Sequence, residues 1–303
     1  MTRSHPLIQP IPIDSVDDPR LSDFRDLKRR PTGRVLNSTH FVVEGQLITG
    51  RLIASDFGVR SVVVEQGRDL DALGEVAAGT PVYAVSRDQM RQLAGFDFHR
   101  GFLASAARKP LGGIDDFRPD PVSLALVHTT DMENLGSMVR SAAAMGIRQI
   151  LIDHRSVDPF SRRAMRVSMG AVLGMRWLVM NDPAGDLRSL ADQGVVSLAS
   201  TLAADAISIG EVSIDTQPTV LVMGNEAEGL PEEVQRAASE RVTIPMPTAP
   251  QPTAPQPTTP QPTTQGCGPL VDSLNVSVAA AILLYELTRA ERLTRAERKR
   301  GQR

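Results

Sequence analysis

The second half of the chain alternates short apolar runs with segments of helical periodicity. The apolar runs occupy residues 122–128, 149–153, 177–180, 195–198, 220–223 and 242–245. Strands that helices bury on both faces have this continuous apolar character, so the pattern predicts an α/β domain with a mostly parallel sheet. Such sheets bind ligands beyond the carboxyl ends of their strands, and we therefore expect a site in the loops that directly follow these runs.

The N-terminal half carries a second, smaller alternation. Two β-rich runs, Ser61–Glu65 and Pro81–Ser86, are interleaved with two helix-like segments, Val43–Ala54 and Arg87–Leu93. This alternation predicts a small α/β unit over residues 21–107.

The stretches on either side of this unit lack periodicity. Residues 1–20 contain four prolines among scattered acids and no continuous apolar run, so we expect a disordered leader and not a secretory signal. Residues 108–121 include the turn-rich sequence KPLGGIDD. We expect them to link the small unit to a second domain over residues 122–303.

A tandem repeat interrupts the second domain. Residues 247–265 have the sequence PTAPQ, PTAPQ, PTTPQ, PTTQ. Proline at this density removes backbone donors and favours polyproline II structure, which fits neither a sheet nor the interior of a helix. We expect an extended, solvated insertion that contributes little to the packed domain.

The composition narrows the class of protein. A chain of 303 residues with 41% hydrophobic content is long enough for two domains with separate cores. No stretch approaches the roughly 20 apolar residues that a membrane span requires. The only cysteine, Cys267, leaves no disulfide framework and no multi-cysteine zinc site, which favours a reducing compartment such as the cytoplasm.

The charge matters through its distribution. A net charge of −2 gives no reason to expect a nucleic acid. Two clusters are nevertheless basic: one between Arg25 and Arg34, and a C-terminal tail over residues 289–303 with seven basic residues against two acidic ones. Such clusters are commonly solvated surface, but they are also what a protein that binds a phosphate backbone needs.

Three motifs carry the candidate chemistry. The first, DMENLGSMVRSA from Asp131, follows the strand expected at 122–128 and ends near Gly146. Asn134 stands where an N-terminal helix cap is wanted, and Gly146 suits a C-terminal cap. The structural alternative is a capped helix whose Arg140 faces water.

The second motif, GNEAEGLP from Gly224, follows the strand expected at 220–223. Its two glycines flank Glu226 and would let a ligand approach the backbone closely. It is not a GxGxxG fingerprint and lacks the lysine of a phosphate loop, so dinucleotide or mononucleotide binding of those kinds is poorly supported. A structural turn would also explain it.

The third motif is split by the repeat. The segment Ile244-Pro245-Met246 precedes it, and VDSLNVSVAAA over residues 271–281 follows it. Ser273 and Asn275 have small hydrogen-bonding side chains that lead directly into an apolar helix. A helix-capping segment is the structural alternative.

Together the three motifs resemble the SpoU, or TrmH, family of RNA ribose 2′-O-methyltransferases. The resemblance covers residues 122 to about 290, in the family's order, and Asp158-Pro159 and Arg166–Ala171 are similar to its middle segment. The segments Phe41–Gly45 and His99–Gly101 are similar to a small ribosomal-protein-like substrate domain that is often fused to this family.

The resemblance implies a fold and a site. The fold would be a SPOUT-type domain with a deep trefoil knot, which no sequence pattern could indicate because knots are almost absent from known folds. The cofactor would be S-adenosylmethionine, held mainly by backbone at Gly224, Ile244 and Leu274, with Met246 close by. The catalytic positions would be Asn134, Arg140, Glu226, Ser273 and Asn275.

The resemblance also implies the partners. The substrate would be RNA, bound partly through the unit over residues 21–107, and the protein would be a homodimer without a metal. We expect ribosomal RNA because of the added N-terminal unit, with transfer RNA as the alternative.

The chemistry constrains the roles of these residues. Methyl transfer to a ribose oxygen is an in-line displacement, so donor and acceptor must be aligned and a proton must leave a weakly acidic hydroxyl. Arginine is a poor base because its pKa exceeds about 12, and we expect Arg140 to stabilise the developing alkoxide and hold the neighbouring phosphate. Family proposals with arginine as the base stay open. Glu226 is expected to fix loop backbone, and Ser273 and Asn275 to hold a nucleotide or order their loop.

The insertion suggests a competing reading. Met246 and Ser273 are 27 positions apart, whereas the family joins these segments through a few residues. A catalytically silent RNA-binding relative with a spoiled pocket is therefore the main rival, although retention of the five catalytic positions argues against it. A nucleotide-dependent oxidoreductase lacks the glycine fingerprint it would need.

Overall fold

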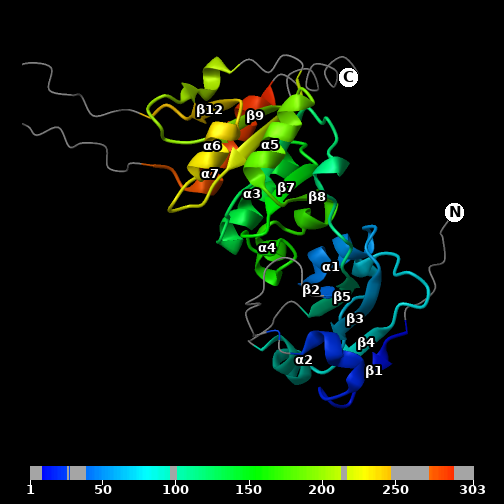
Figure 1. Ribbon diagram of the computed structural model, residues 1–303. Coiled ribbons are helices and arrows are strands. Elements are labelled where there is room, and N and C mark those ends of the chain that lie inside the picture. The colour runs from blue at the N-terminus through cyan, green and yellow to red at the C-terminus, as the bar shows by residue number, and fades with distance from the viewer. Residues whose placement is uncertain are drawn as a thin grey trace, which may run out of the picture.

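The computed structural model describes residues 9–25, 27, 39–95, 101–212, 217–246 and 273–289. They form two sheets, one in each half of the chain (Figure 1). No helix within these ranges is long and apolar enough to cross a membrane.

The N-terminal sheet has the strand order β1-β4-β3-β5-β2. The pairs β1–β4 and β3–β4 are parallel, and β5 runs antiparallel to both β2 and β3. The strands are β1 Ile11–Pro12, β2 His40–Glu44, β3 Val59–Glu65, β4 Val82–Val85 and β5 Phe102–Ala107. Helix α1 (Gln46–Ile53) packs on one face of this sheet and α2 (Arg87–Ala94) on the other.

Two expectations about this half are wrong. The leader expected over residues 1–20 is ordered from residue 9 onwards, because β1 pairs with β4 and Ile13 is buried against the sheet. The helix expected over Val43–Ala54 begins only after Gly45, and Val43 is part of β2. Gly45 has φ +91, a backbone conformation that glycine adopts without strain, so the chain turns sharply there from strand to helix.

The C-terminal sheet has seven strands, all parallel, in the order β10-β12-β9-β11-β6-β7-β8. The mostly parallel sheet expected from the apolar runs is confirmed. The strands are β6 Val122–Leu126, β7 Gln149–Asp153, β8 Arg176–Met180, β9 Val196–Ser200, β10 Ile207–Ser208, β11 Thr219–Met223 and β12 Glu240–Thr243.

Helices cover both faces of this sheet (Figure 1). One face packs against α3 (Met132–Ala144), α4 (Arg162–Val167) and α7 (Val276–Leu287), and the other against α5 (Pro183–Asp192) and α6 (Glu232–Ala237). Successive residues of β6 show this division, since Leu124 belongs to the first core and Ala125 to the second. Alternation of side chains between the two faces of a strand produces it.

The two halves are packed against each other. The rings of Phe41 on β2 and Phe160 before α4 lie 5.1 Å apart, within a core that draws residues from both halves. Residues 108–121, expected as a linker, run along β8: the Gly112 amide donates to the Trp177 carbonyl at 3.1 Å. The connecting segment is therefore docked on the second sheet.

Three expectations fall outside the described residues. The trefoil knot depends on the path of residues 247–272, which include the proline-rich insertion at 247–265. The basic tail also lies outside the described residues from residue 290 onwards.

Candidate active site

The first motif forms the loop after β6 and the start of α3. The Asp131 carboxylate accepts hydrogen bonds from the amides of Glu133 (2.7 Å) and Asn134 (2.8 Å), so Asp131 is the N-cap. The expectation that Asn134 caps this helix is wrong, because Asp131 already supplies the acceptor and has the extended backbone that a cap requires. Asn134 lies instead in the first turn. Gly146 follows the helix with φ +93, as expected for its C-terminal end.

The second motif is a tight loop that folds back on itself after β11. The amide and carbonyl of Asn225 exchange hydrogen bonds of 3.0 Å with the carbonyl and amide of Gly229. Gly224 is buried beneath this loop, and a Cβ atom there would lie 2.4 Å from the Gly229 carbonyl carbon and 2.5 Å from the Leu230 nitrogen. Only glycine fits at this point.

Asn225 ties this loop to the first motif. Its Nδ2 donates to the carbonyl of His128 (2.9 Å) and to Oγ1 of Thr130 (3.0 Å), both in the loop after β6. Its Oδ1 accepts from the amides of Ala227 (2.8 Å) and Glu228 (3.1 Å). Neither Asn225 nor Thr130 was expected at the site from the sequence. The signal was an asparagine between two turn glycines, since asparagine commonly accepts hydrogen bonds from its own loop backbone.

A chain of polar side chains then joins all three motifs. Asn275 Nδ2 donates to Asn134 Oδ1 at 3.1 Å, and Asn134 Nδ2 donates to Glu226 Oε1 at 3.1 Å. Thr130 Oγ1 donates to Glu226 Oε2 at 3.4 Å. Three of the five expected catalytic residues are thus in direct contact, although Asn134 and Asn275 are 141 positions apart in sequence.

Asn275 has a second role in the fold. Its Oδ1 accepts from the Ser277 amide at 2.9 Å and from the Ser277 hydroxyl at 2.7 Å, which makes Asn275 the N-cap of α7. The helix-capping role is therefore confirmed for this residue, and its contact with Asn134 is compatible with the expected place in the site. One side of its amide starts the helix while the other contacts Asn134.

A cavity of about 580 Å³ lies beyond the carboxyl ends of β9, β11 and β12. All four residues expected to hold the cofactor line it, together with Glu226 and Ser273. Those four are Gly224, Ile244, Met246 and Leu274. Its lining combines loop residues and apolar side chains with charged side chains, among them Glu228, Glu232 and Arg241. Its volume lies within the range of about 300–1,000 Å³ typical of small-molecule sites. The donor set and size fit a nucleoside-containing cofactor.

Arg140 lies apart from this cluster. It is exposed on α3 and forms no hydrogen bond or ion pair with the residues that the structure describes. Six helical positions separate it from Asn134, which corresponds to about 9 Å along the axis and roughly 120° around it. The structure brings together Asn134, Glu226 and Asn275 and places Ser273 at the cavity, but leaves the Arg140 side chain facing solvent.

The described part of the chain contains no group of three or more His, Cys, Asp or Glu residues placed to hold a metal ion.

Known proteins with similar sequences are RNA methyltransferases by name. The model of the SpoU rRNA Methylase family matches residues 121–251. An uncharacterised tRNA/rRNA methyltransferase of Mycobacterium tuberculosis is 33% identical over 284 residues, covering 90% of each chain. A 23S rRNA (guanosine-2′-O-)-methyltransferase of Acinetobacter baylyi is 29% identical over 236 residues, covering 74% of this chain and 86% of its own.

Solved structures share the fold over both halves. An AdoMet-bound rRNA methyltransferase from Sinorhizobium meliloti matches 92% of this chain and 97% of its own, with a TM-score of 0.74 and 24% identity. An RNA 2′-O ribose methyltransferase matches 93% of this chain and 98% of its own, with a TM-score of 0.67 and 28% identity. The motifs, the cavity and these relatives lead to one conclusion: the chain belongs to the SpoU rRNA methylase family.

Proposed function

We propose that this protein transfers a methyl group from S-adenosylmethionine to a ribose 2′-hydroxyl of ribosomal RNA. The observation that carries the proposal is the chain from Asn275 through Asn134 to Glu226, which borders a cavity of cofactor size. The similarity to an enzyme named as a 23S rRNA (guanosine-2′-O-)-methyltransferase supports the choice of reaction and RNA. Transfer RNA is the alternative substrate.

The cavity residues would bind the cofactor. S-adenosylmethionine supplies an activated methyl group on sulfur. Gly224 allows the loop backbone to approach it, and Ile244, Met246 and Leu274 provide the apolar walls. A pocket of this kind would align the donor for in-line displacement, which is a large part of what such a reaction requires.

The polar chain would position the acceptor. Both Glu226 oxygens accept hydrogen bonds, from Asn134 and Thr130, so Glu226 would hold the two loops together. Ser273 lines the cavity from the other side and can donate to or accept from a ribose hydroxyl. Arg140 would contribute a permanent positive charge to the developing alkoxide and the adjacent phosphate.

The N-terminal unit over residues 21–107 would bind the RNA outside the reaction centre. We also propose that the C-terminal domain contains a trefoil knot. The proline-rich insertion at 247–265 is expected to be dispensable for catalysis because its sequence is unsuited to a packed core.

The test is to map 2′-O-methyl groups in total RNA from cells with and without the gene. One ribose in ribosomal RNA should lose its mark in the mutant, and the purified protein with S-adenosylmethionine should restore it. Loss of a mark in transfer RNA would favour the alternative substrate. If no ribose mark changed in either class and the purified protein failed to bind S-adenosylmethionine, the silent RNA-binding relative would be the better description.

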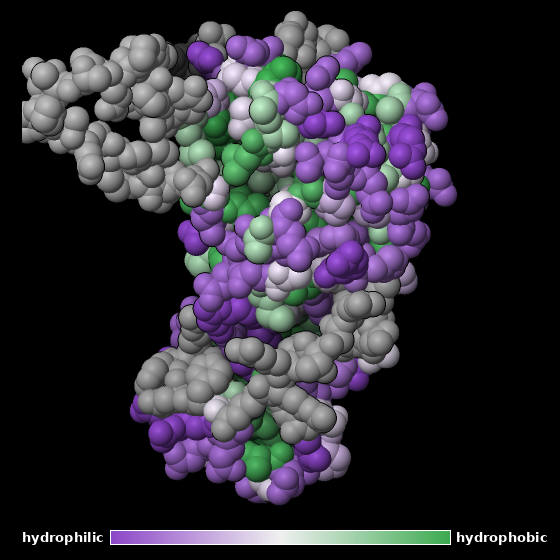
Figure 2. All heavy atoms as spheres, turned by 60° about the vertical axis from the view of Figure 1, so that its left-hand side comes forward, coloured by the Kyte–Doolittle hydropathy of each residue, from purple (hydrophilic) through white to green (hydrophobic). Residues whose placement is uncertain are grey.

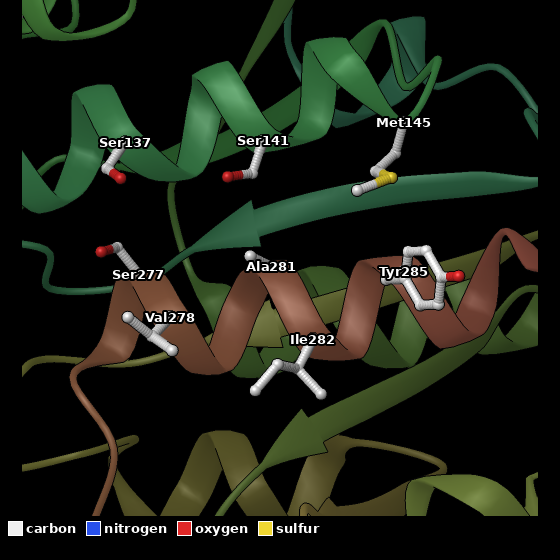
Figure 3. Close-up of a pocket in the computed structure, with 8 residues that line it drawn as sticks. All are labelled: Ser137, Ser141, Met145, Ser277, Val278, Ala281, Ile282 and Tyr285. Atoms are coloured by element: carbon white, nitrogen blue, oxygen red, sulfur yellow. The ribbon is translucent and has the colours of Figure 1, made fainter.

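A homodimer is part of the same proposal. Helices α3 and α7 border a groove whose α7 side carries apolar residues (Figure 3). Val278, Ile282 and Tyr285 are 47%, 40% and 51% exposed. Helix α7 lies on the left-hand side of Figure 1. Figure 2 turns this side to the front and shows hydrophobic surface there on the C-terminal domain. An apolar helix face of this kind is suited to a two-fold contact with a second copy.

We therefore expect a dimer in sedimentation at micromolar concentration. Ile282→Glu should produce a monomer, because two copies of the carboxylate would be buried near the two-fold axis without a partner. Leu47→Glu is the matched control, since Leu47 is 49% exposed on α1, away from the groove, and should leave the dimer intact. A wild-type monomer under these conditions would refute the proposed assembly.

A further inference from the structure

The two halves of the molecule meet across buried charges that the proposed reaction does not use. The side chain of Glu44, the last residue of β2, is 2% exposed. Its carboxylate pairs with Arg166 and lies 3.5 Å from Arg162, both on α4 of the other half. A carboxylate removed this far from water is costly unless cations compensate it. The arginines of α4 therefore stabilise the buried charge of Glu44, and Glu44 in turn holds α4 against the N-terminal half.

Burial also affects the charge of Arg162 in this cluster. It lowers the pKa of the Arg162 guanidinium, while the neighbouring Glu44 carboxylate acts in the opposite direction. The ordinary pKa of arginine is so high that the group stays cationic at neutral pH. This cluster thus contains one buried anion, Glu44, between two cations.

Further contacts fix both ends of α4. Before the helix, the Asp158 carboxylate accepts a fork of two hydrogen bonds from Arg108, which follows β5. Both of these side chains are largely buried, at 10% and 14% exposed. After the helix, the Met169 carbonyl accepts a hydrogen bond from Arg51 on α1. In Figure 1, α4 lies at the boundary, next to the N-terminal half.

Helix α4 in turn contacts the catalytic helix α3. A Cβ atom at Gly136 would lie 2.8 Å from the Val167 Cβ and 2.9 Å from the Ala164 carbonyl oxygen, so the two backbones touch at this glycine. Gly136 stands between Asn134 and Arg140 on α3. A shift of α4 would therefore move the turn of α3 that connects these two residues.

We propose that Glu44 is a positioning residue for the reaction: through α4 it holds the segment of α3 that bears Asn134 and Arg140. The N-terminal unit then supports the active site through this interface, in addition to binding RNA outside the reaction centre. The expected effect on turnover rests on the proposed function, whereas the expected effect on α3 can be measured without RNA. Arg163, also on α4, pairs with Glu133 on α3 and so joins these two helices within the C-terminal half.

The kinetic test uses Glu44→Gln in the full chain, which keeps the shape of the side chain and removes its charge. We expect kcat to fall at least tenfold. Affinity for S-adenosylmethionine in calorimetry should stay within twofold of wild type, because the cavity borders β9, β11 and β12 and not α4. Glu65→Gln is the control: Glu65 lies on β3 and pairs with Arg68 inside the N-terminal half, so its turnover should be unchanged. A Glu44→Gln enzyme with kcat within twofold of wild type would overturn the proposal.

A second readout does not require an RNA substrate. Amide hydrogen exchange over residues 135–141 of α3 should accelerate in Glu44→Gln, while exchange over residues 187–191 of α5 should not. If wild type proved inactive on ribosomal RNA, the proposed function would fail but this comparison would still decide the coupling. Unchanged exchange in α3 would contradict it.

A third variant guards against misfolding. The double variant E44R/R166E reverses the ion pair between positions 44 and 166 and should recover part of the turnover lost in Glu44→Gln. If Glu44→Gln could not be purified, Arg166→Lys keeps the charge without the planar fork. It should lower kcat at least threefold with the same exchange pattern in α3, and a variant that matched wild type in both would refute the role of Glu44.

Discussion

Arg140→Ala should abolish methyl transfer while leaving the fold and the cofactor affinity intact. We expect turnover to fall at least 100-fold, because removal of one group that stabilises a developing oxyanion typically costs about 2.7 kcal/mol or more. Affinity for S-adenosylmethionine should not change, since Arg140 is exposed on α3 and does not line the cavity. Single-turnover methylation of the RNA and calorimetry with the cofactor measure the two effects separately.

Arg188→Ala is the matched control for this variant. Arg188 is an exposed arginine on α5, which covers the opposite face of the same sheet, and its loss should leave turnover unchanged. Arg140→Lys should recover part of the activity, because lysine keeps the positive charge but not the planar fork of donors. A fall of less than tenfold in Arg140→Ala, equivalent to about 1.4 kcal/mol of barrier, would show that the assigned role is wrong.

The sequence was sufficient to locate most of the candidate site. Loops that follow parallel strands gather at one edge of the sheet. The residues after β6, β11 and β12 therefore had to come close, and Asn134, Glu226 and Ile244 lie in those loops or just after them. Asn275 was predicted only through the resemblance, because no local pattern indicates that it contacts a residue 141 positions away.

Other features of the fold have no signal in the local sequence. β5 was not expected, since its sequence FLASAA lacks the run of β-branched residues that marks a strand. It lies between β2 and β3, and its small side chains are buried there by tertiary packing. The interface at Glu44 was not predicted from the sequence either. Its acid and its arginines are more than 100 positions apart, and a charged residue at the end of an apolar run ordinarily indicates solvent.

Gly224→Ala should destroy cofactor binding without unfolding the domain. The added Cβ would lie 2.4–2.6 Å from backbone atoms of Gly229 and Leu230. Backbone cannot move aside as a flexible side chain can, so the loop over residues 225–229 must shift. That loop lines the cavity and holds Glu226 against Asn134. We expect the dissociation constant for S-adenosylmethionine to rise at least 30-fold, equivalent to about 2 kcal/mol.

The domain should still fold, because the strand before Gly224 is buried in the centre of the sheet between β9 and β6. Circular dichroism should show native secondary structure with a melting temperature lowered by a few degrees. Gly174→Ala is the control: a Cβ atom there would meet no atom within 4 Å, so cofactor affinity should match wild type. If Gly224→Ala bound S-adenosylmethionine within threefold of wild type, the cofactor would have to lie elsewhere, and the assignment of this cavity would fail with it.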